Sequence, residues 1–527
     1  MKKSLFTALL AILGIAGATT AQTNVFPRPQ YIETADGEYV VTASTAIVAE
    51  EGTTAPAERF SEDMRVFFPE AKRPMKIARH GKGIKLREDP CIAAEGYEMT
   101  VTPREITITG GSEAGVYYGL QTLRQMIVTG NGRVPCCFIA DEPAFAYRGA
   151  MLDVCRHFFT VEQVKRYIDI LAAHKLNRFH WHLTDDQGWR IEIERYPELT
   201  VKGGTRKQTL VGHGSNSDRY DGTPHGGFYT KEQIREVIDY AAARYITVIP
   251  EIEMPGHALA AMAAYPWLGC RGADYPYEVW TRWGITPEVM CAGRETTYEF
   301  LENVLTEVIE LFPSEYIHIG GDESPRDRWK ECEHCQAFIS EHGLDGEDGL
   351  QGYLVNRIEK WLMAHGRKMI GWDEILGCGI SQTANIMSWR GAKGGIAAAK
   401  RGNDVIMTPS SHCYFDSYQT RERVGEPLAI GRHVPVEKVY AFDPYDKLEA
   451  DERRHILGVQ CNMWTEYIAD FDHLQRMLLP RLAAICEVQW AADRRDAATL
   501  RERMEVLRRF YDACGYPYAP YFFEGKE

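Results

Sequence analysis

The sequence has no excess of basic residues: 60 Lys and Arg stand against 74 Asp and Glu, and the formal net charge is −14. Nucleic acids and anionic membranes attract basic surfaces, so neither is expected to be the main partner. After residue 21 there is also no long apolar run, which argues against an integral membrane span. Internal repeats and low-complexity segments are missing as well.

The length and composition indicate more than one globular domain. The 527 residues exceed one ordinary domain, so two or three are expected. Hydrophobic residues make up 45% and charged residues 25%, which is typical of globular proteins. The 11 Trp and 27 Tyr are a generous supply. Such an excess can be plain core, but it also suits sugar binding, where flat rings cover the apolar faces of pyranoses.

Residues 1–21 are predicted to be an export signal. Lys2 and Lys3 give it a basic start, and Leu5 to Ile15 form an apolar stretch that is too short to span a membrane. Small residues follow at 16–21 as cleavage candidates, without the cysteine just behind them that would indicate a lipoprotein. The mature protein is therefore expected in the periplasm or outside the cell.

The chain has thirteen cysteines, many for an exported protein, and because the number is odd at least one has no partner in the same chain. Cys332 and Cys335 form a Cys-x-x-Cys unit that resembles half a zinc site, but the sequence has no second such unit to complete it. We therefore favour a structural role for this pair, as a local disulfide or as buried thiols. Disulfide pairing and oligomeric state stay open, and no metal or cofactor is predicted.

Residues 22–143 are predicted to form a small, non-catalytic α+β domain. The segments at 97–101 and 105–109 are arranged like a hairpin, bounded by Pro103 and by Gly110-Gly111. From Ser112 to Ile127 the apolar residues recur at helical spacing. Among these residues we find no constellation of acids, bases or nucleophiles.

Residues 144–492 show alternating strand and helix patterns and are predicted to form an α/β domain, a (β/α)₈ TIM barrel with insertions. The helices after the fifth and seventh strands are weak in the sequence. A last helix at 497–513, within a C-terminal segment 493–527, is expected to pack on the barrel. The predicted strands are 150–154, 178–183, 247–252, 316–320, 368–372, 384–389, 404–407 and 456–463.

The stretch from Tyr316 to Pro325 places two acids at the end of the fourth predicted strand. A short apolar run stops at Gly320-Gly321, and Asp322 and Glu323 follow at once. In a (β/α)₈ barrel the carboxyl ends of the strands form the active-site face. The alternative is a strand-to-helix turn in which the two acids only cap the next helix.

Other polar and aromatic clusters also fall at the ends of predicted strands, which favours one shared site at that rim. For Asp153 and His180 taken singly, a satisfied interior polar group is the better interpretation. Three tryptophans at strand ends beside acids fit a sugar pocket better than plain core. The clusters are Asp153, Arg156 and His157; His180 to Asp186; Glu251 to His257; Trp372 to Glu374; Trp389; Tyr414 to Asp416; and Trp464 to Glu466.

Several of these blocks resemble the family 20 glycoside hydrolases, the β-N-acetylhexosaminidases. The central block is His318-Ile-Gly-Gly-Asp322-Glu323. The blocks follow the family's order over about residues 145–490, and their combination is far more specific than any one of them. The preceding small domain resembles the family's usual N-terminal domain more loosely. The other blocks are Arg148 to Phe158, His180 to Gln187, Pro255 to His257, Trp372 to Glu374, Tyr414 to Asp416 and Trp464 to Glu466.

The adjacency of Asp322 and Glu323 bears on mechanism. Two carboxyl groups that flank a glycosidic bond stand ~5 to ~9.5 Å apart, whereas consecutive Cα atoms are ~3.8 Å apart and do not easily straddle a sugar ring. We expect Glu323 to protonate the leaving oxygen and later deprotonate water, with a raised pKa. Asp322, kept ionised, would hold the substrate's 2-acetamido group while its oxygen attacks the anomeric carbon. The outcome is retention through an oxazolinium intermediate.

The resemblance also implies an exo-acting enzyme that removes terminal β-linked GlcNAc, with GalNAc left open, and it implies roles for further residues. Tyr414 should donate a hydrogen bond to the acetamido oxygen. Binding of the terminal hydroxyls closes one end of the pocket, so cleavage is expected from the non-reducing end. The implied pocket wall is Trp372, Trp389 and Trp464; the implied hydroxyl ligands are Arg156, Asp416 and Glu466; and the implied supports of the catalytic pair are Asp185 and His257.

Two other functions fit parts of the pattern. A metal-dependent hydrolase would use His180-x-His182, whose alternate residues share a strand face, together with His257 and an acid. A sugar-binding protein with an inactive barrel has no need for a proton donor, so the Asp322-Glu323 pair argues against it. Chelator sensitivity tests the first alternative, and release of 4-nitrophenol from its N-acetyl-β-glucosaminide tests the second.

Overall fold

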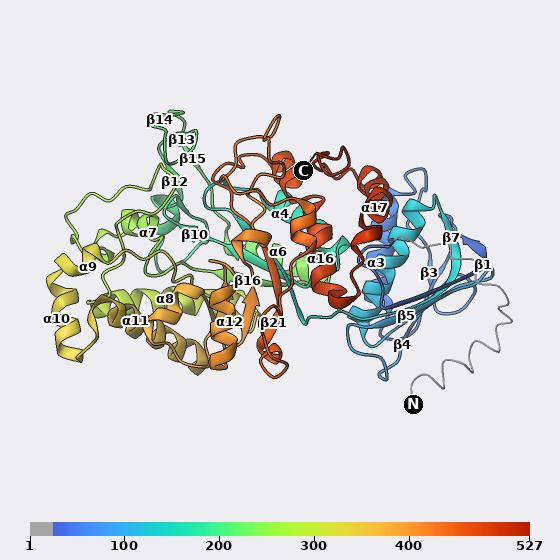
Figure 1. The fold of residues 1–527 in the computed structure, drawn as a ribbon, viewed down its shortest axis with the longest axis horizontal. Coiled ribbons are helices and arrows are strands. Elements are labelled where there is room, and N and C mark those ends of the chain that lie inside the picture. Colours follow the sequence, from blue (N-terminus) through green and yellow to red (C-terminus); the bar gives the residue numbers. More distant parts are fainter. Residues whose placement is uncertain (1–24, 527) are drawn as a thin grey trace. The chain divides into compact units, whose positions relative to one another are not determined.

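The computed structural model describes residues 25–526, so the predicted export signal lies outside the described part of the chain. Within it the chain divides into two compact units (Figure 1). The N-terminal unit runs to Ala144 and also takes in Ala173–Lys175 and Cys486–Tyr518; the second unit comprises Phe145–Ala172, Leu176–Ile485 and the residues from Ala519.

The N-terminal unit is built on a seven-stranded mixed sheet in the order β1-β7-β5-β6-β4-β2-β3. The predicted hairpin is confirmed, since β5 (Tyr97–Val101) and β6 (Ile106–Gly110) pair antiparallel. Alternate residues of both strands are buried, because one face of the sheet is covered by α3. The other elements are β1 Tyr31–Val40, β2 Ile47–Ala49, β3 Ile77–Ala78, β4 Ile84–Glu88, β7 Arg133–Asp141, α2 Thr54–Asp63, η1 Met64–Val66 and α3 Glu113–Thr129.

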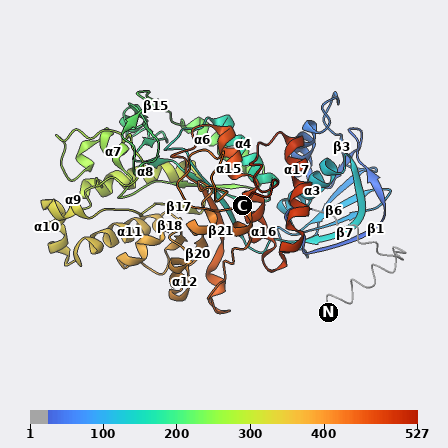
Figure 2. The ribbon, with the colours of Figure 1, turned by 45° about the horizontal axis from the view of Figure 1, so that its top comes forward.

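The last helix, α17 (Leu500–Cys514), packs on α3 in this same unit, and Figures 1 and 2 show the two helices side by side. Its apolar residues Met504, Leu507 and Tyr511 are buried, as their helical spacing predicts. The helix was expected to pack on the barrel, but its apolar stripe covers α3 of the N-terminal unit, whereas the residues from Ala519 belong to the second unit. The 3-10 helices η5 (Ala492–Arg494) and η6 (Ala497–Thr499) precede it.

A buried ion pair ties the segment 173–175 into the N-terminal unit. Lys175 is only 1% exposed, and its Nζ lies 3.4 Å from Oδ2 of Asp141 and 3.1 Å from the hydroxyl of Tyr97. The indole N–H of Trp490 donates to the same Asp141 oxygen at 3.0 Å. A buried charge needs such pairing and hydrogen bonding to be tolerated, so residues far apart in sequence depend on one another here.

The second unit is a closed eight-stranded parallel barrel, as predicted. β18 and β21 have the predicted bounds, and the other strands differ at their ends by at most three residues. Parallel pairing brings all carboxyl ends to one rim. In barrel order the strands are β16 Thr247–Glu251, β17 Tyr316–His318, β18 Lys368–Trp372, β19 Asn385–Ser388, β20 Val405–Met407, β21 Ile456–Met463, β8 Tyr147–Asp153 and β9 Arg178–His182.

The helices around the barrel are irregular where the sequence pattern is weak. Only the 3-10 helix η3 (Asp373–Cys378) follows β18, and the short α13 (Ser410–Cys413) and α14 (Val436–Tyr440) follow β20. Two helices follow β21, because Pro480 lacks an N–H and separates α15 (Phe471–Leu478) from α16 (Arg481–Trp490). The remaining barrel helices are α4 Val161–Ala173, α6 Lys231–Ala242, α8 Glu295–Leu311, α11 Gly346–Ala364 and α12 Ala392–Arg401.

Long insertions follow β9, β16 and β17, and they contain short elements of their own. Loops at the carboxyl ends of barrel strands are where such folds build their sites. The elements are β10 Thr184–Asp185, β11 Gly188–Trp189, α5 Glu198–Val201, β12 Thr205–Arg206, β13 Leu210–Val211, β14 Arg219–Tyr220, β15 His225–Gly226, α7 Leu259–Ala264, η2 Pro266–Leu268, α9 Asp327–Glu331 and α10 Glu333–His342; the 3-10 helix η4 Arg453–His455 leads into β21.

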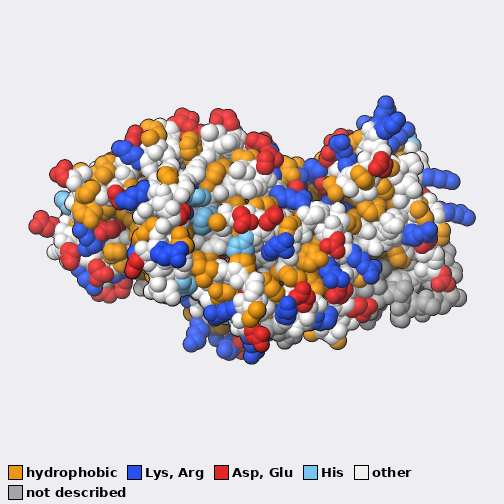
Figure 3. Space-filling model, turned by 90° about the horizontal axis from the view of Figure 1, so that it is seen from above, with side chains coloured by type: hydrophobic (Ala, Val, Ile, Leu, Met, Phe, Trp, Pro, Cys, Tyr) orange, Lys and Arg blue, Asp and Glu red, His pale blue; other side chains and the backbone are white. Residues whose placement is uncertain are grey.

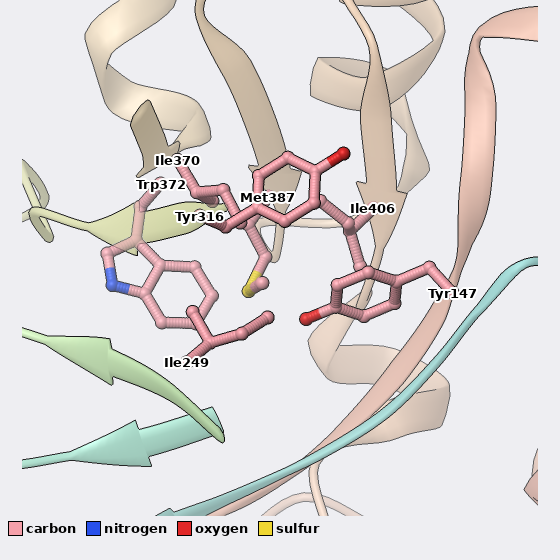
Figure 4. Packing of buried hydrophobic residues seen from close by; sticks show 7 residues of the cluster. All are labelled: Tyr147, Ile249, Tyr316, Ile370, Trp372, Met387 and Ile406. Carbon is pink, nitrogen blue, oxygen red and sulfur yellow. The ribbon is translucent and has the colours of Figure 1, made fainter. Parts of the chain in front are cut away.

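The barrel interior is a packed core, in which side chains from different strands converge (Figure 4). Trp389, Leu457 and Trp464 are partly buried and pack against it. The core therefore packs directly beneath the carboxyl-end rim of the barrel. Large aromatic residues contribute to both layers. Its buried members are Tyr147, Ile249, Tyr316, Ile370, Trp372, Met387 and Ile406.

The surface mixes charges of both signs. On the face drawn in Figure 3, acidic and basic side chains are interspersed among apolar ones. Within residues 25–526, none of the helices has the length and apolar character needed to cross a membrane.

Candidate active site

Neighbouring barrel strands align a row of polar side chains at their carboxyl ends. The register pairs Asp153 of β8 with His182 of β9, and His182 with Glu251 of β16. Glu251 in turn pairs with His318 of β17. All four side chains are completely buried. The row underlies the rim at which the predicted site residues gather.

Glu251 is the centre of this row. Its carboxylate lies 3.0 Å from Nε2 of His180 and 2.5 Å from Nδ1 of His182. Nδ1 of His318 lies at 2.9 Å, and the indole N–H of Trp372 donates to it at 2.7 Å. Burial opposes ionisation of Glu251, but the imidazoles outweigh it and hold the pKa of Glu251 well below its ordinary value.

The histidines of the metal-hydrolase alternative do not converge on one point. His180 and His182 both contact Glu251, whereas His257 stands in a separate group with Asp185 and Asp186. The three histidines that this alternative requires therefore do not form one ligand set.

A chain of imidazoles and carboxylates leads from Glu251 to the rim. Nε2 of His182 lies 2.8 Å from Oδ2 of Asp185, and Oδ1 of Asp185 lies 3.2 Å from Nδ1 of His257. Burial alone would lower the pKa of both histidines. The carboxylates outweigh it, Glu251 foremost for His182 and Asp185 foremost for His257. The pKa of His182 is raised to about 10, and that of His257 well above its ordinary value.

The backbone after β17 turns sharply to present Asp322 and Glu323. Gly320 has φ +67°, and a Cβ there would stand 1.7 Å from Oε2 of Glu253, so only glycine fits. Glu323 itself has φ +39°, a strained conformation of the kind that clusters at functional sites. The next helix, α9, has Arg326 at its N-cap. The interpretation of the two acids as helix caps is therefore wrong.

Asp322 is buried with one oxygen unpaired. It is 7% exposed, and its Oδ1 has no hydrogen-bond partner among residues 25–526. Burial raises the pKa of Asp322 to about 7, and the charge of Glu323 adds to the effect. The sequence led us to expect an ionised Asp322, whereas a pKa of about 7 allows both the protonated and the ionised form near neutral pH.

His257 faces both acids of the pair. Its Nε2 lies 3.4 Å from Oε2 of Glu323 and 3.7 Å from Oδ2 of Asp322. Both carboxylates therefore stand at one imidazole edge, on one side of the cavity. This arrangement fits an acid–base residue beside a helper better than two acids on opposite sides of a glycosidic bond.

A cavity of about 420 Å³ opens beside these acids, within the range of small-ligand sites. Its aromatic wall includes Trp389 and Tyr414, whose rings stack with centroids 6.0 Å apart, and Trp464, whose ring centroid lies 6.3 Å from that of Tyr414. Trp372, predicted as a third wall residue, is not among the lining side chains. It lies beneath them at 1% exposure, with its ring centroid 6.0 Å from that of Trp464.

The predicted hydroxyl ligands line the same cavity as the acid pair. Nη2 of Arg156 lies 2.9 Å from Oδ2 of Asp185, and Nη1 lies 3.9 Å from Oε1 of Glu466. The other oxygen of Glu466, Oε2, has no partner within the described chain. Burial raises the pKa of Asp416 to about 7, with Glu466 adding to it. These groups are desolvated but incompletely paired, as expected where a polar ligand completes the site.

Several lining residues escaped the sequence reasoning. Trp283 and Tyr467 line the cavity, with ring centroids 6.4 Å apart, and the hydroxyl of Tyr467 accepts from the N–H of Gly214 at 3.0 Å. Trp283 and Gly214 come from the insertions after β16 and β9, which carry no periodic pattern. Tyr467 follows the Trp464-Thr-Glu466 block directly, and that adjacency was the available signal. Glu253, from the predicted cluster at the end of the third strand, also lines the cavity; the other lining residues, which were not predicted, are His213, Ser215, Gly284, Ile285, Ile430 and Arg432.

Comparison with known families decides which protein class this geometry represents. The description "Glycosyl hydrolase family 20, catalytic domain" matches residues 145–493, and "Glycosyl hydrolase family 20, domain 2" matches residues 22–142. The chain belongs to glycosyl hydrolase family 20. The family predicted from the sequence blocks is thereby confirmed, including the family 20 character of the N-terminal domain.

The sequences of two relatives align with most of this chain. A β-hexosaminidase of Porphyromonas gingivalis is 43% identical over 93% of this chain, which spans 63% of that relative's length. A β-hexosaminidase of Vibrio furnissii is 38% identical over 89% of this chain, and the match covers 77% of that relative's length.

Among solved structures, the family 20 exo β-N-acetylglucosaminidase of Vibrio harveyi in complex with N-acetylglucosamine has a TM-score of 0.84 at 31% identity. The match covers 96% of this chain and 79% of that one.

Proposed function

We propose that this family 20 protein is an exo-acting β-N-acetylhexosaminidase that removes terminal β-linked GlcNAc, or GalNAc, from oligosaccharides or glycoconjugates. The observation that supports it most directly is the unpaired Oδ1 of Asp322, buried beside Glu323 in an aromatic-lined cavity. A desolvated carboxylate oxygen without a partner calls for an N–H donor from the ligand. The N–H of a 2-acetamido group is such a donor.

Asp322 orients the acetamido group in the proposed reaction. Its carboxylate accepts the acetamido N–H, which turns the acetamido oxygen towards the anomeric carbon. As that oxygen attacks, positive charge develops on the oxazolinium ring and the nearby carboxylate stabilises it. Binding of the N–H also favours the ionised form, which offsets the raised pKa of the substrate-free Asp322.

Glu323 is the proposed general acid and base. It protonates the glycosidic oxygen as the bond to the anomeric carbon breaks, and it later removes a proton from the water that opens the oxazolinium ring. Its side chain is about one-third exposed, so a leaving group and then a water can reach it. Two displacements at one carbon give net retention of configuration.

The remaining predicted residues complete this proposal. Tyr414 donates to the acetamido oxygen, Trp389 and Trp464 wall the sugar, and Trp372 supports Trp464 from below. Arg156, Asp416 and Glu466, which line the cavity, bind the hydroxyls of the terminal sugar. Because these residues would occupy the hydroxyls of the terminal sugar, no preceding sugar is attached there and the enzyme acts on the non-reducing terminus.

We also propose that the protein is exported to the periplasm or the exterior, on the strength of the basic and apolar pattern in residues 1–21. Cell fractionation followed by N-terminal sequencing of the mature chain tests this. A cytoplasmic protein that retains Met1 would contradict it.

The decisive experiment compares 4-nitrophenyl N-acetyl-β-glucosaminide with 4-nitrophenyl β-glucoside, and it follows the anomer first released by proton NMR. We expect rapid hydrolysis of the acetamido substrate, poor hydrolysis of the glucoside, and the β-anomer as first product. Efficient hydrolysis of the plain glucoside contradicts the role of the acetamido group, and an α-anomer contradicts retention. If correctly folded protein releases no 4-nitrophenol, the sugar-binding alternative is favoured.

A further inference from the structure

Four cysteines from two barrel loops meet at one point, and none of them is among the residues that line the cavity. Cys270 and Cys291 belong to the insertion after β16, and Cys332 and Cys335 to the insertion after β17. One sulfur atom from each lies within 4.8 Å of the other three. The sequence showed only the Cys332-x-x-Cys335 half, because the other two are isolated cysteines that no spacing rule connects.

The sulfur–sulfur distances show which chemistry fits. Sγ of Cys291 lies 3.7 Å from Sγ of Cys332 and 3.6 Å from Sγ of Cys335, and Sγ of Cys270 lies 3.9 Å from Sγ of Cys335. A disulfide bond is ~2.05 Å long, so these sulfurs are not bonded to one another. The edge of a tetrahedron of thiolates around Zn²⁺, with Zn–S distances of ~2.3 Å, is ~3.8 Å.

We propose that these four cysteines bind one Zn²⁺ ion in a closed, tetrahedral Cys₄ site. Cys291, Cys332 and Cys335 are buried and Cys270 is partly exposed, so the sulfurs are largely withdrawn from water. Four protein ligands leave no open position for water or substrate, which is the mark of a structural site. The chemical step at Asp322 and Glu323 needs nothing from this ion.

The surrounding backbone supports a preformed site. Cys332 is the N-cap of α10 and Cys335 lies in its first turn, where the helix dipole favours negative charge. Gly293 lies against this turn so closely that a Cβ on it would stand 2.5 Å from Cα of Cys335. The two loops therefore approach each other at backbone distance, which places single cysteines of one loop opposite the Cys-x-x-Cys of the other.

The metal joins the two loops that carry much of the candidate active site. The insertion after β16 supplies His257, Trp283 and Ile285, and the insertion after β17 begins with Asp322 and Glu323. Zinc bound to cysteines of both loops would cross-link the two loops and restrict their motion relative to each other.

A partly buried cluster of one acid and two arginines reinforces the same connection between the loops. Oε1 of Glu288, in the insertion after β16, lies 3.1 Å from Nε of Arg271 and 2.8 Å from Nη2 of Arg328 in α9. Because Arg271 follows Cys270 directly, this cluster and the metal site brace the same stretch of chain.

The test uses the full mature chain, produced with zinc in the medium and purified without chelator. We expect about one zinc per chain by plasma mass spectrometry. Protein produced with Co²⁺ in place of zinc should show the intense sulfur-to-cobalt charge-transfer absorption and the ligand-field bands of tetrahedral cobalt. The Cys270→Ser and Cys291→Ser variants should lose the metal. The matched control is Cys378→Ser, another partly exposed cysteine of the same unit, and it should keep one zinc per chain.

Each contrary outcome overturns the proposal. Metal-free wild-type protein whose four cysteines are free thiols, or are joined as disulfides by mapping of non-reduced peptides, excludes the site. Retention of zinc by both cluster variants, or its loss from Cys378→Ser, places the metal elsewhere. If the variants fail to fold, the cobalt spectrum of the wild-type chain still decides, because octahedral or thiolate-free cobalt contradicts Cys₄ ligation.

Discussion

The Nε2 atom of His257 lies 3.4 Å from Oε2 of Glu323, while its Nδ1 is held by the buried carboxylates of Asp185 and Asp186. The carboxylates fix both the ring and its proton, so His257 presents a positive edge to the exposed acid. Glu323 thereby belongs to a network that reaches through Asp185 and His182 to Glu251 in the barrel interior. A positioned acid needs such support from residues that do not touch the substrate.

Glu323→Gln removes the proposed proton donor. We expect hydrolysis of chitobiose, whose leaving group needs protonation, to fall by about 10³-fold or more. Hydrolysis of substrates with strongly activated aryl leaving groups should fall far less in the first displacement. Steady-state kinetics on both substrates measure the difference, with the exposed Glu310→Gln on α8 as control. Equal losses on both substrates contradict the role of Glu323 as the acid.

Asp322→Asn replaces the carboxylate with a neutral amide that cannot stabilise a developing positive charge. We expect kcat to fall by about 10²-fold or more. In the wild-type enzyme, kcat/KM should decline as the pH falls through about 7, because the raised pKa of Asp322 causes it to protonate there. The variant should lack this acid limb. An unchanged limb in Asp322→Asn assigns the titration to another group.

Tyr414→Phe deletes the proposed donor to the acetamido oxygen but keeps the ring that stacks near Trp389. We expect a loss of about 2 kcal/mol of transition-state stabilisation, which is roughly 30-fold in kcat/KM. The buried Tyr418→Phe, outside the cavity lining, is the matched control and should stay within about 2-fold of wild type. A Tyr414→Phe variant with wild-type kinetics would remove this residue from the proposed site.

Glu251→Gln tests the buried network by its stability rather than its activity. Removing one charge from a buried, paired cluster should cost about 3–5 kcal/mol in the free energy of unfolding. Because the pKa of Glu251 is depressed in the folded protein, its contribution to the free energy of unfolding is present above its pKa in the unfolded chain, about 4.3. That contribution is lost as the pH falls from there towards the folded pKa. Because the pKa of His182 is raised in the folded protein, its contribution to the free energy of unfolding is fully present below its unfolded pKa of about 6.5. That contribution is lost as the pH rises through about 10.

The stability difference between wild type and Glu251→Gln should therefore be largest at about pH 5–6 and shrink towards pH 10. Urea denaturation followed by intrinsic fluorescence at several pH values measures it. A difference that is independent of pH would show that packing, and not the charge network, sets the cost of the substitution.

The barrel was predictable because its signals are local. Strands such as Lys368–Trp372 and Ile456–Met463 are short apolar runs bounded by polar residues, and their bounds could be given from the sequence. The acids that follow these strands lie at the rim because all eight parallel strands end there. This is why Asp322, Glu323 and the other predicted lining residues came together.

The features that were not predicted depend on contacts between residues far apart in the sequence. Trp283 reaches the cavity from an insertion without periodicity, and Cys270 and Cys291 become a pair only when two loops fold against each other. Trp372 and Trp389 both stand at the ends of strands, yet alternation along β18 turns the ring of Trp372 into the core. The apolar stripe of α17 indicated a packed helix but not which neighbour it covers.

The assignment of α17 to the N-terminal unit has a consequence for the order of synthesis. The sheet and α3 leave the ribosome first, but the helix that covers α3 is made only after the whole barrel. The N-terminal unit therefore stays incomplete, with an apolar helix face uncovered, until the last forty or so residues appear. Truncation at about residue 490 should thus destabilise the N-terminal unit, although the cut lies far from its sheet in the sequence.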